Sequence, residues 1–125
     1  MKLLKVADIL AMHILLIEKT GGSGGVRDMG RIESCVQSMQ QTVFGAEAYP
    51  TIFDKSAVLI RSIVGDHPFV DGNKRTAMLA AITMLKINGV DFSAESGEIE
   101  DYAVYVAIKK PDVATISKWL TKHSA

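Results

Sequence analysis

The stretch HPFVDGNKRTAMLAAITML, residues 67–85, decides the fold and carries the densest group of polar side chains in the chain. Residues 76–85 are apolar in nearly every position, which is the pattern of a helix surrounded by protein on all sides. We predict this helix over residues 75–88, because the Asn-Gly pair at 88–89 signals a helix end. The apolar run is shorter than the ~20 residues that span a bilayer, so we expect no membrane segment.

Helical spacing of apolar residues continues on both sides, with glycines and prolines between the periodic stretches. The GGSGG run at 21–25 is expected to be a mobile connector rather than a phosphate-binding loop, because no Gly-Lys-Ser/Thr follows it. Residues 90–94 carry too little β signal for a sheet. We predict an all-α fold with one domain over residues 1–125, a compact bundle of about six helices around a central buried helix. The other expected helices are residues 5–19, 28 or 29–44, 51–65, 98–109 and 112–122.

The composition limits the possible functions. Fourteen basic and fourteen acidic side chains cancel, so no overall field draws the chain onto nucleic acid or an anionic membrane, and we expect neither as a direct partner. One cysteine, Cys35, cannot form an intrachain disulfide, which fits a reducing, cytoplasmic location. Cys35 lies in a helical pattern and is interpreted as a buried thiol rather than a nucleophile. Asp8 and His13 interrupt the apolar N-terminal run, so we expect no signal peptide there.

Polar residues gather at the start of the predicted central helix. Asp71 is either an N-cap, accepting a hydrogen bond from an amide of the first turn, or an oxygen ligand for a metal ion. Lys74 and Arg75 stand where the helix dipole is already positive, which costs ~0.3–1 kcal/mol per cation at an exposed helix end. An anion should compensate, and free amides, flexible Gly72, the Asn73 amide and two cations together favour a phosphate chain. ATP with Mg²⁺, held by Asp71, is the natural candidate.

His67 precedes this helix on a loop. Near neutral pH an imidazole can take a proton from an attacking hydroxyl, which makes His67 the candidate general base. Pro68 stiffens the loop, and Phe69 is expected to insert into the core and fix the direction of the imidazole. The other histidines lack such neighbours, so His13 is interpreted as a satisfied helix residue and His123 as a solvated tail residue.

The residues HPFVDGNKR at 67–75 resemble the signature of the Fic/Doc family, which has a histidine, a phenylalanine, an acidic residue, Gly-Asn and a final arginine at this spacing. A Gly-Gly loop followed by GRIES, and NGV after the next helix, extend the resemblance over residues 20–90, closest to the Doc (death on curing) branch. The resemblance implies an all-α fold in which the motif loop and the following helix form an ATP site.

Roles of individual residues follow from the resemblance position by position. His67 corresponds to the catalytic base and Asp71 to the magnesium ligand, while Phe69, next to Pro68, corresponds to the buried anchor of the motif. The phosphate-handling positions of the family are occupied here by Gly72, Asn73, Lys74 and Arg75.

Lys74 bears on the reaction that the resemblance implies. Family members that transfer AMP typically have glycine there, which leaves an open anion hole, whereas Doc-type motifs have a lysine that fills it. The implied consequence is a nucleotide bound in the opposite sense, with its γ-phosphate facing the target hydroxyl. Such an enzyme is a protein kinase, and the target in Doc is a threonine of elongation factor Tu. Gly72 is typical of AMP-transferring motifs, so AMP transfer is one alternative; a catalytically silent nucleotide- or partner-binding module is another.

Inhibition is expected to come from another protein. Many Fic proteins block their own ATP site with a helix marked by Ser/Thr, three residues, Glu and Gly/Asn, and this chain has no such match. The resemblance to Doc implies a Phd-type antitoxin whose C-terminal segment folds onto the toxin. An apolar surface groove is therefore expected.

Overall fold

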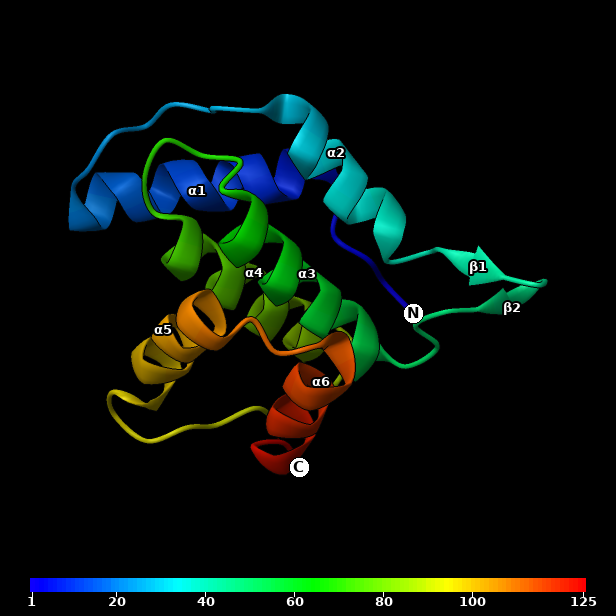
Figure 1. The fold of residues 1–125 in the computed structure, drawn as a ribbon. Coiled ribbons are helices and arrows are strands. Elements are labelled where there is room, and N and C mark those ends of the chain that lie inside the picture. The colour runs from blue at the N-terminus through cyan, green and yellow to red at the C-terminus, as the bar shows by residue number, and fades with distance from the viewer.

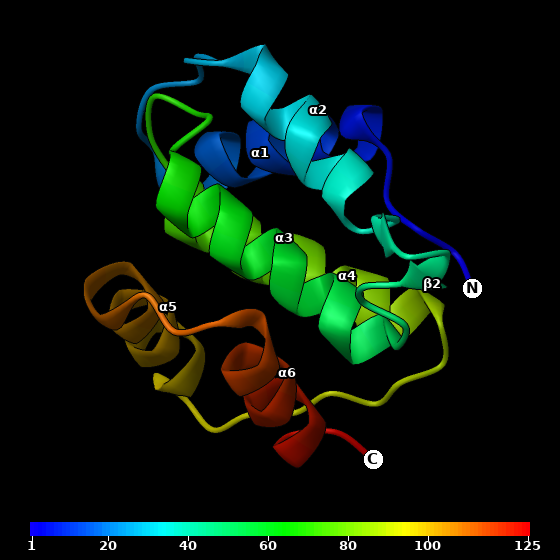
Figure 2. The same ribbon diagram turned by 45° about the vertical axis from the view of Figure 1, so that its right-hand side comes forward.

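The computed structural model describes residues 1–125 and contains six helices and one two-stranded hairpin (Figure 1). The helices form three layers, with α1 and α2 on one side, α3 and α4 in the middle, and α5 and α6 on the other side (Figure 2). No helix has both the length and the apolar character needed to cross a bilayer. The elements are α1 (Val6–Thr20), α2 (Met29–Ser38), β1 (Thr42–Val43), β2 (Ala46–Glu47), α3 (Ile52–Asp66), α4 (Asn73–Ile87), α5 (Glu98–Lys109) and α6 (Val113–Lys122).

Two helices, rather than the single one predicted, occupy the centre. Helix α3 packs against α4, α6, α2 and α5, and α4 packs against α3, α1 and α5. Ala77, Ala80 and Ala81 of α4 are completely buried, and their small side chains let the neighbouring helices approach closely. The prediction for residues 75–88 recognised α4 because it is apolar on all sides. The amphipathic pattern of α3 did not show that its polar positions, such as Lys55 and Ser56, are buried as well.

The second predicted helix is wrong at its C-terminal end. Helix α2 ends at Ser38, and residues 42–47 form an antiparallel hairpin. Phe44 and Gly45, at the tip, both have positive φ, 52° and 80°, as a two-residue type I′ turn requires. The apolar spacing that continues beyond Met39 imitates a helix, but Gly45 is a turn residue and not a helix stop.

A buried lysine ties this hairpin to the core. Lys55 Nζ donates to the carbonyls of Met39 (2.9 Å) and Tyr49 (2.5 Å) and to Glu47 Oε1 (3.0 Å). The Lys55 side chain is 3% exposed. All three protons of the ammonium group therefore have acceptors, which is the condition for burying a lysine.

The C-terminus closes the third layer of helices. Residues 91–93 run antiparallel to residues 123–125, with a single bridge between Phe92 and Ser124, so the weak extended signal at 90–94 makes a bridge and no sheet.

His123 is not the solvated tail residue that was predicted. Its Nδ1 donates to the Trp119 carbonyl and its Nε2 to Glu98 Oε2, both at 2.8 Å. The hydrogen bond to Trp119 and the Glu98 carboxylate raise the pKa of His123. The imidazole thus joins the end of α6 to the start of α5.

Cys35 lies buried on α2. Burial raises the pKa of its thiol to about 12. Since the thiolate is the reactive form of cysteine, this residue is a packing thiol, as predicted.

Candidate active site

His67 stands at the turn between the two central helices. It ends α3 in the left-handed conformation, with φ 49° and ψ 58°, and its N–H donates to the Ile63 carbonyl at 3.3 Å. Such a backbone conformation costs ~1–3 kcal/mol for a residue other than glycine and persists where the surroundings enforce it. Pro68 follows and has no N–H to continue the helix. The imidazole is exposed at the point where the chain turns from α3 toward α4.

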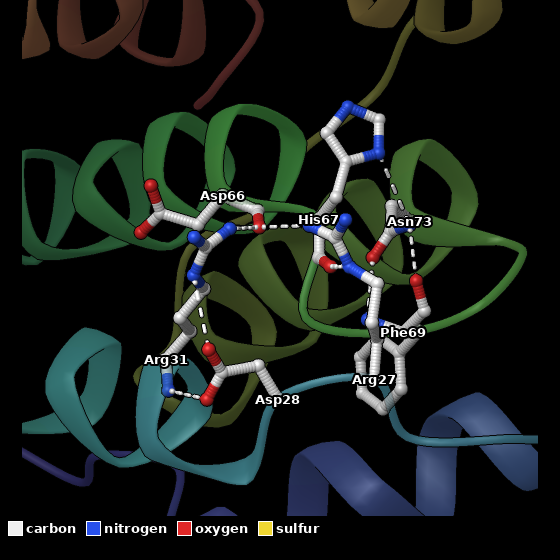
Figure 3. Close-up of polar contacts among 7 residues, drawn as sticks. All are labelled: Arg27, Asp28, Arg31, Asp66, His67, Phe69 and Asn73. Atoms are coloured by element: carbon white, nitrogen blue, oxygen red, sulfur yellow. Dashed lines mark hydrogen bonds and ion pairs between the residues drawn. The ribbon is translucent and has the colours of Figure 1, made fainter.

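Asn73, the first residue of α4, is buried within this turn and binds its backbone. It is 7% exposed; its Oδ1 accepts the Phe69 N–H at 3.0 Å, and its Nδ2 donates to the Phe69 carbonyl at 2.9 Å. The same Nδ2 lies 3.4 Å from His67 Nδ1 (Figure 3). The side-chain amide is therefore engaged within the loop. Asn73 was predicted to contact phosphate, and only its backbone N–H remains free for such a contact.

Phe69 is buried, 1% exposed, and rests on a histidine of α1. The rings of His13 and Phe69 are stacked, with centroids 3.8 Å apart and an interplanar angle of 9°. His13 Nε2 donates to the Asp71 carbonyl at 2.8 Å. His13 is thus a satisfied, buried helix residue, as predicted, but its partner is the motif loop itself.

Two arginines hold the backbone at His67 from the α2 side (Figure 3). Arg27 donates through Nε to the His67 carbonyl at 2.8 Å and through Nη2 to the Asp66 carbonyl at 3.0 Å. Arg31 donates through Nη1 to the same Asp66 carbonyl and pairs with Asp28 at 3.2 Å. Carbonyls in the last turn of a helix lack intrahelical partners. The arginines therefore satisfy the end of α3 and stabilise the left-handed conformation of His67.

The glycine-rich segment 21–25 lies beside the motif loop, as Figure 1 shows for the α1–α2 connection. The Val70 N–H donates to the Gly25 carbonyl at 2.9 Å, and the Arg27 N–H donates to the Pro68 carbonyl at 2.7 Å. The segment connects two helices, as predicted, and it also forms one wall of the site.

The first turn of α4 presents free amides together with cations. The N–H groups of Asn73, Lys74 and Arg75 have no acceptor within the chain, since backbone hydrogen bonding begins with the Thr76 N–H to the Gly72 carbonyl at 2.9 Å. The turn contains no acidic residue. No side chain caps the start of α4, and its first turn carries no carboxylate that would offset the positive end, which is the arrangement that binds anions.

Asp71 is not the N-cap, which was one of its two predicted roles. Gly72 occupies that position with φ 76°, and the Asp71 carboxylate accepts the N–H groups of Gly72 (Oδ1, 2.8 Å) and Ser23 (Oδ2, 3.4 Å). A Cβ on Gly22 would lie 2.5 Å from Asp71 Oδ2, so this close approach requires glycine.

The second predicted role of Asp71, as a magnesium ligand, fits its surroundings. The carboxylate is exposed and lies next to the free amides of α4. Mg²⁺ takes one or two carboxylates and completes its shell with phosphate oxygens and water. The chain has no cluster of three His, Cys or acidic residues that would hold a metal ion alone. One exposed carboxylate suits a magnesium ion whose other ligands are phosphate oxygens and water.

An apolar groove begins at the same end of α4. It has a volume of about 520 Å³, lies between α1, α4 and α5, and is lined mostly by hydrophobic side chains together with Lys74, Arg75 and Glu100. Arg75 Nη1 donates to Thr20 Oγ1 at 2.9 Å, whereas the Lys74 ammonium has no partner within the chain. The groove expected from the resemblance is present, and any occupant would lie against both cations.

Comparison with known proteins agrees with this geometry. A profile of the Fic/DOC family matches residues 3–85. The chain belongs to the Fic/Doc family. It is 42% identical over 107 residues to Toxin Doc of Mycolicibacterium smegmatis (strain ATCC 700084 / mc(2)155), and the match covers 84% of this chain and 82% of that protein. It is 31% identical over 115 residues to Protein kinase doc of Escherichia phage P1, covering 92% of this chain and 90% of that one. The resemblance to Doc toxins is confirmed.

The site of this Fic/Doc chain includes residues that sequence reasoning missed. The motif residues predicted from the sequence all lie in or beside the α3–α4 turn. Arg27, Arg31 and His13 were given no part in the site. The sequence signals for a role of these residues in the site were weak. Arg31 lies within GRIES, which was used only as evidence for the family. His13 follows Ile9 by four residues, a spacing that indicates only that both lie on the buried face of α1.

Proposed function

We propose that this protein is a Doc-like toxin and an ATP-dependent protein kinase that transfers the γ-phosphate of ATP to a serine or threonine hydroxyl of a translation factor. One observation carries the proposal. An exposed imidazole lies 3.4 Å from the Asn73 amide, and Arg27 and Arg31 hold the backbone carbonyls of Asp66 and His67. It stands next to a helix start with three free amides, two cations and no acidic residue in its first turn.

The triphosphate binds at the start of α4. The free amides of Asn73, Lys74 and Arg75 and the helix dipole favour a phosphate group, and the two cationic side chains add charge-assisted contacts. Asp71 would hold Mg²⁺, and the ion would supply charge neutralisation for the phosphates.

His67 takes the proton of the substrate alcohol. His67 Nε2 has no partner within the chain, and it can take the proton when the ring carries its own proton on Nδ1. In that tautomer the 3.4 Å approach of Asn73 Nδ2 to Nδ1 is a contact and not a hydrogen bond. The alcohol oxygen forms a bond to the γ-phosphorus, the bond from that phosphorus to the β–γ bridging oxygen breaks, and ADP leaves with the electron pair. Phosphoryl transfer requires mainly positioning and charge neutralisation, so no covalent enzyme intermediate is needed.

Lys74 supports transfer of the γ-phosphate rather than of AMP. A lysine stands where AMP-transferring members have glycine, and the similar protein of Escherichia phage P1 is named a protein kinase. Gly72 does not weigh against this, because the left-handed φ of 76° at the N-cap is itself a reason for glycine.

The toxin assignment rests on the similar proteins and on the groove. Elongation factor Tu is the proposed substrate and the cytoplasm the proposed location, by analogy with Doc. A Phd-type antitoxin, folding as a helix into the groove between α1, α4 and α5, would cover Lys74 and Arg75 and so block the phosphate site.

The test is label transfer to purified elongation factor Tu with Mg²⁺ and ATP labelled at either the γ- or the α-phosphate. We expect γ-label on the substrate, a loss of about 10²- to 10⁴-fold for His67→Ala, and for Asp71→Asn a lower activity that needs a higher Mg²⁺ concentration. Lys86→Gln, which changes an exposed side chain at the opposite end of α4 from the motif, should keep full activity. Label from the α-phosphate would establish AMP transfer instead, and ATP binding without any transfer would indicate a silent module.

A further inference from the structure

A second cavity reaches His67 from the side opposite to α1 and α2. It has a volume of about 550 Å³ and lies between the C-terminal ends of α3 and α5. In Figure 3 the imidazole points away from the α1 and α2 ribbons. The lining residues that matter below are Arg61, Val64, Gly65, His67, Ala107 and Lys110.

The two helices that border this cavity end in the same way. His67 caps α3 and Lys110 caps α5, each in the left-handed conformation with φ 49° and φ 50°, and each is followed by a proline. Because Pro68 and Pro111 have no N–H, the carbonyls four residues earlier receive no hydrogen bond from the backbone. These carbonyls belong to Val64 and Ala107, and both residues line the cavity.

A further backbone acceptor is open at the end of α3. The Gly65 carbonyl would normally receive the Phe69 N–H, but that N–H donates to Asn73 Oδ1 at 3.0 Å. The cavity therefore adjoins three backbone acceptors without donors, those of Val64, Gly65 and Ala107. An occupant that supplies N–H donors would satisfy them.

The charged side chains that line the cavity determine which charge an occupant should carry. Arg61 and Lys110 both line it, neither forms an ion pair within the chain, and both are exposed. Asp66 is the one acidic residue of the lining. Asp112 does not line the cavity; Thr115 and, to a lesser degree, Arg61 lower its pKa, so this carboxylate lies near Arg61. Within the lining itself the two cations outnumber the one carboxylate, which favours an occupant that carries carboxylates.

We propose that this cavity binds an extended, acidic segment of the protein substrate, next to the hydroxyl that accepts the phosphate. The inference rests on the proposed function and assigns the substrate specificity of the same site. Backbone N–H groups of the segment pair with the open carbonyls of Val64, Gly65 and Ala107. Its acidic side chains pair with Arg61 and Lys110, and the hydroxyl is presented to His67.

The cavity lies apart from the sites proposed for the nucleotide and for the antitoxin. Unpaired carbonyls repel a phosphate chain, and the free amides that suit phosphates lie at the start of α4. The apolar groove that suits an amphipathic helix is a different depression, between α1, α4 and α5. The substrate segment and the triphosphate thus reach His67 from two sides, as an in-line transfer requires.

The test compares the full chain with the double variant Arg61→Gln/Lys110→Gln. Lys86→Gln is the matched control, since Lys86 is an exposed lysine in the last turn of α4 that does not line the cavity. Two readouts are used: steady-state transfer to elongation factor Tu, and fluorescence anisotropy of short threonine-centred peptides flanked by glutamates or by lysines. Thermal unfolding of each variant checks that it folds.

We expect the double variant to raise both KM for the protein and Kd for the acidic peptide about tenfold, with kcat and the affinity for ATP changed less than about twofold. The acidic peptide should bind wild type about tenfold more tightly than the basic one, and added salt should weaken it. Unchanged peptide affinity in the double variant, equal binding of the two peptides, or no binding of either overturns the inference. Loss of ATP affinity instead would make the cavity a nucleotide subsite. The peptide readout needs no catalysis, so it decides the inference even if wild type transfers no label and the proposed function fails.

Discussion

His13 and Phe69, which are far apart in the sequence, stack face to face with their ring centroids 3.8 Å apart, and His13 Nε2 also donates to the Asp71 carbonyl. One side chain of α1 therefore fixes both the anchor of the motif and the backbone of the proposed metal ligand. The precision of the site depends on the packing of α1 as much as on the motif.

Replacing His13 separates these two contributions. We expect His13→Ala to lower the free energy of unfolding by roughly 2–4 kcal/mol, because a buried ring and a hydrogen bond are lost together. His13→Phe keeps a ring against Phe69 but cannot donate to Asp71, so it should recover part of the stability and little of the activity. Urea unfolding and label transfer measure the two effects, and equal recovery of both would contradict the assigned role.

Asn73 is expected to act through the loop and not through a phosphate. Asn73→Ala leaves the Phe69 N–H and carbonyl without partners, at roughly 1–3 kcal/mol for each buried group, and releases His67. Asn73→Asp can still accept from Phe69 but cannot donate, so its loss of stability should be smaller. If either variant instead lost ATP affinity while its stability and kcat were unchanged, the side chain would be a phosphate ligand after all.

The arginine pair should control turnover. Arg27→Ala and Arg31→Ala remove donors to the carbonyls of His67 and Asp66, and a displaced base can lower kcat up to about 10²-fold while ATP still binds. Arg27→Lys is a sharper probe, because one ammonium group cannot reproduce the fork that spans both carbonyls. Titration calorimetry with ATP and single-turnover kinetics distinguish a positioning role from a nucleotide contact, which would weaken ATP binding.

The pair formed by His123 and Glu98 should make stability depend on pH. Hydrogen bonding to Trp119 and Glu98 raises the pKa of His123, so its contribution is fully present below the unfolded value, about 6.5, and is lost as pH rises through the folded value. The Glu98 pKa is lowered, first by the Glu95 N–H and then by His123, so its contribution is lost as pH falls through the folded value. The stability difference between wild type and His123→Gln should therefore be larger at pH 6 than at pH 9 in denaturant titrations. A difference independent of pH would show that the ring acts by packing alone.

The sequence was most informative where structure is local. Five of the six helices were predicted within about two residues of their bounds, because their apolar periodicity and their Gly and Pro boundaries are properties of neighbouring residues. The error at residues 39–44 has the same origin, since a hairpin tip with Phe44 at positive φ left no local signal different from a helix.

The sequence by itself determined the helical bundle, the α3–α4 turn and the chemical groups that the turn carries. Tertiary structure decided how those groups are held. The left-handed His67 is stabilised by arginines 36 and 40 positions away, Phe69 rests on a histidine from the first helix, and Asp71 lies against Gly22. Such contacts follow from the packing of α1 and α2 on the central helices, and packing joins residues that periodicity along the chain cannot relate.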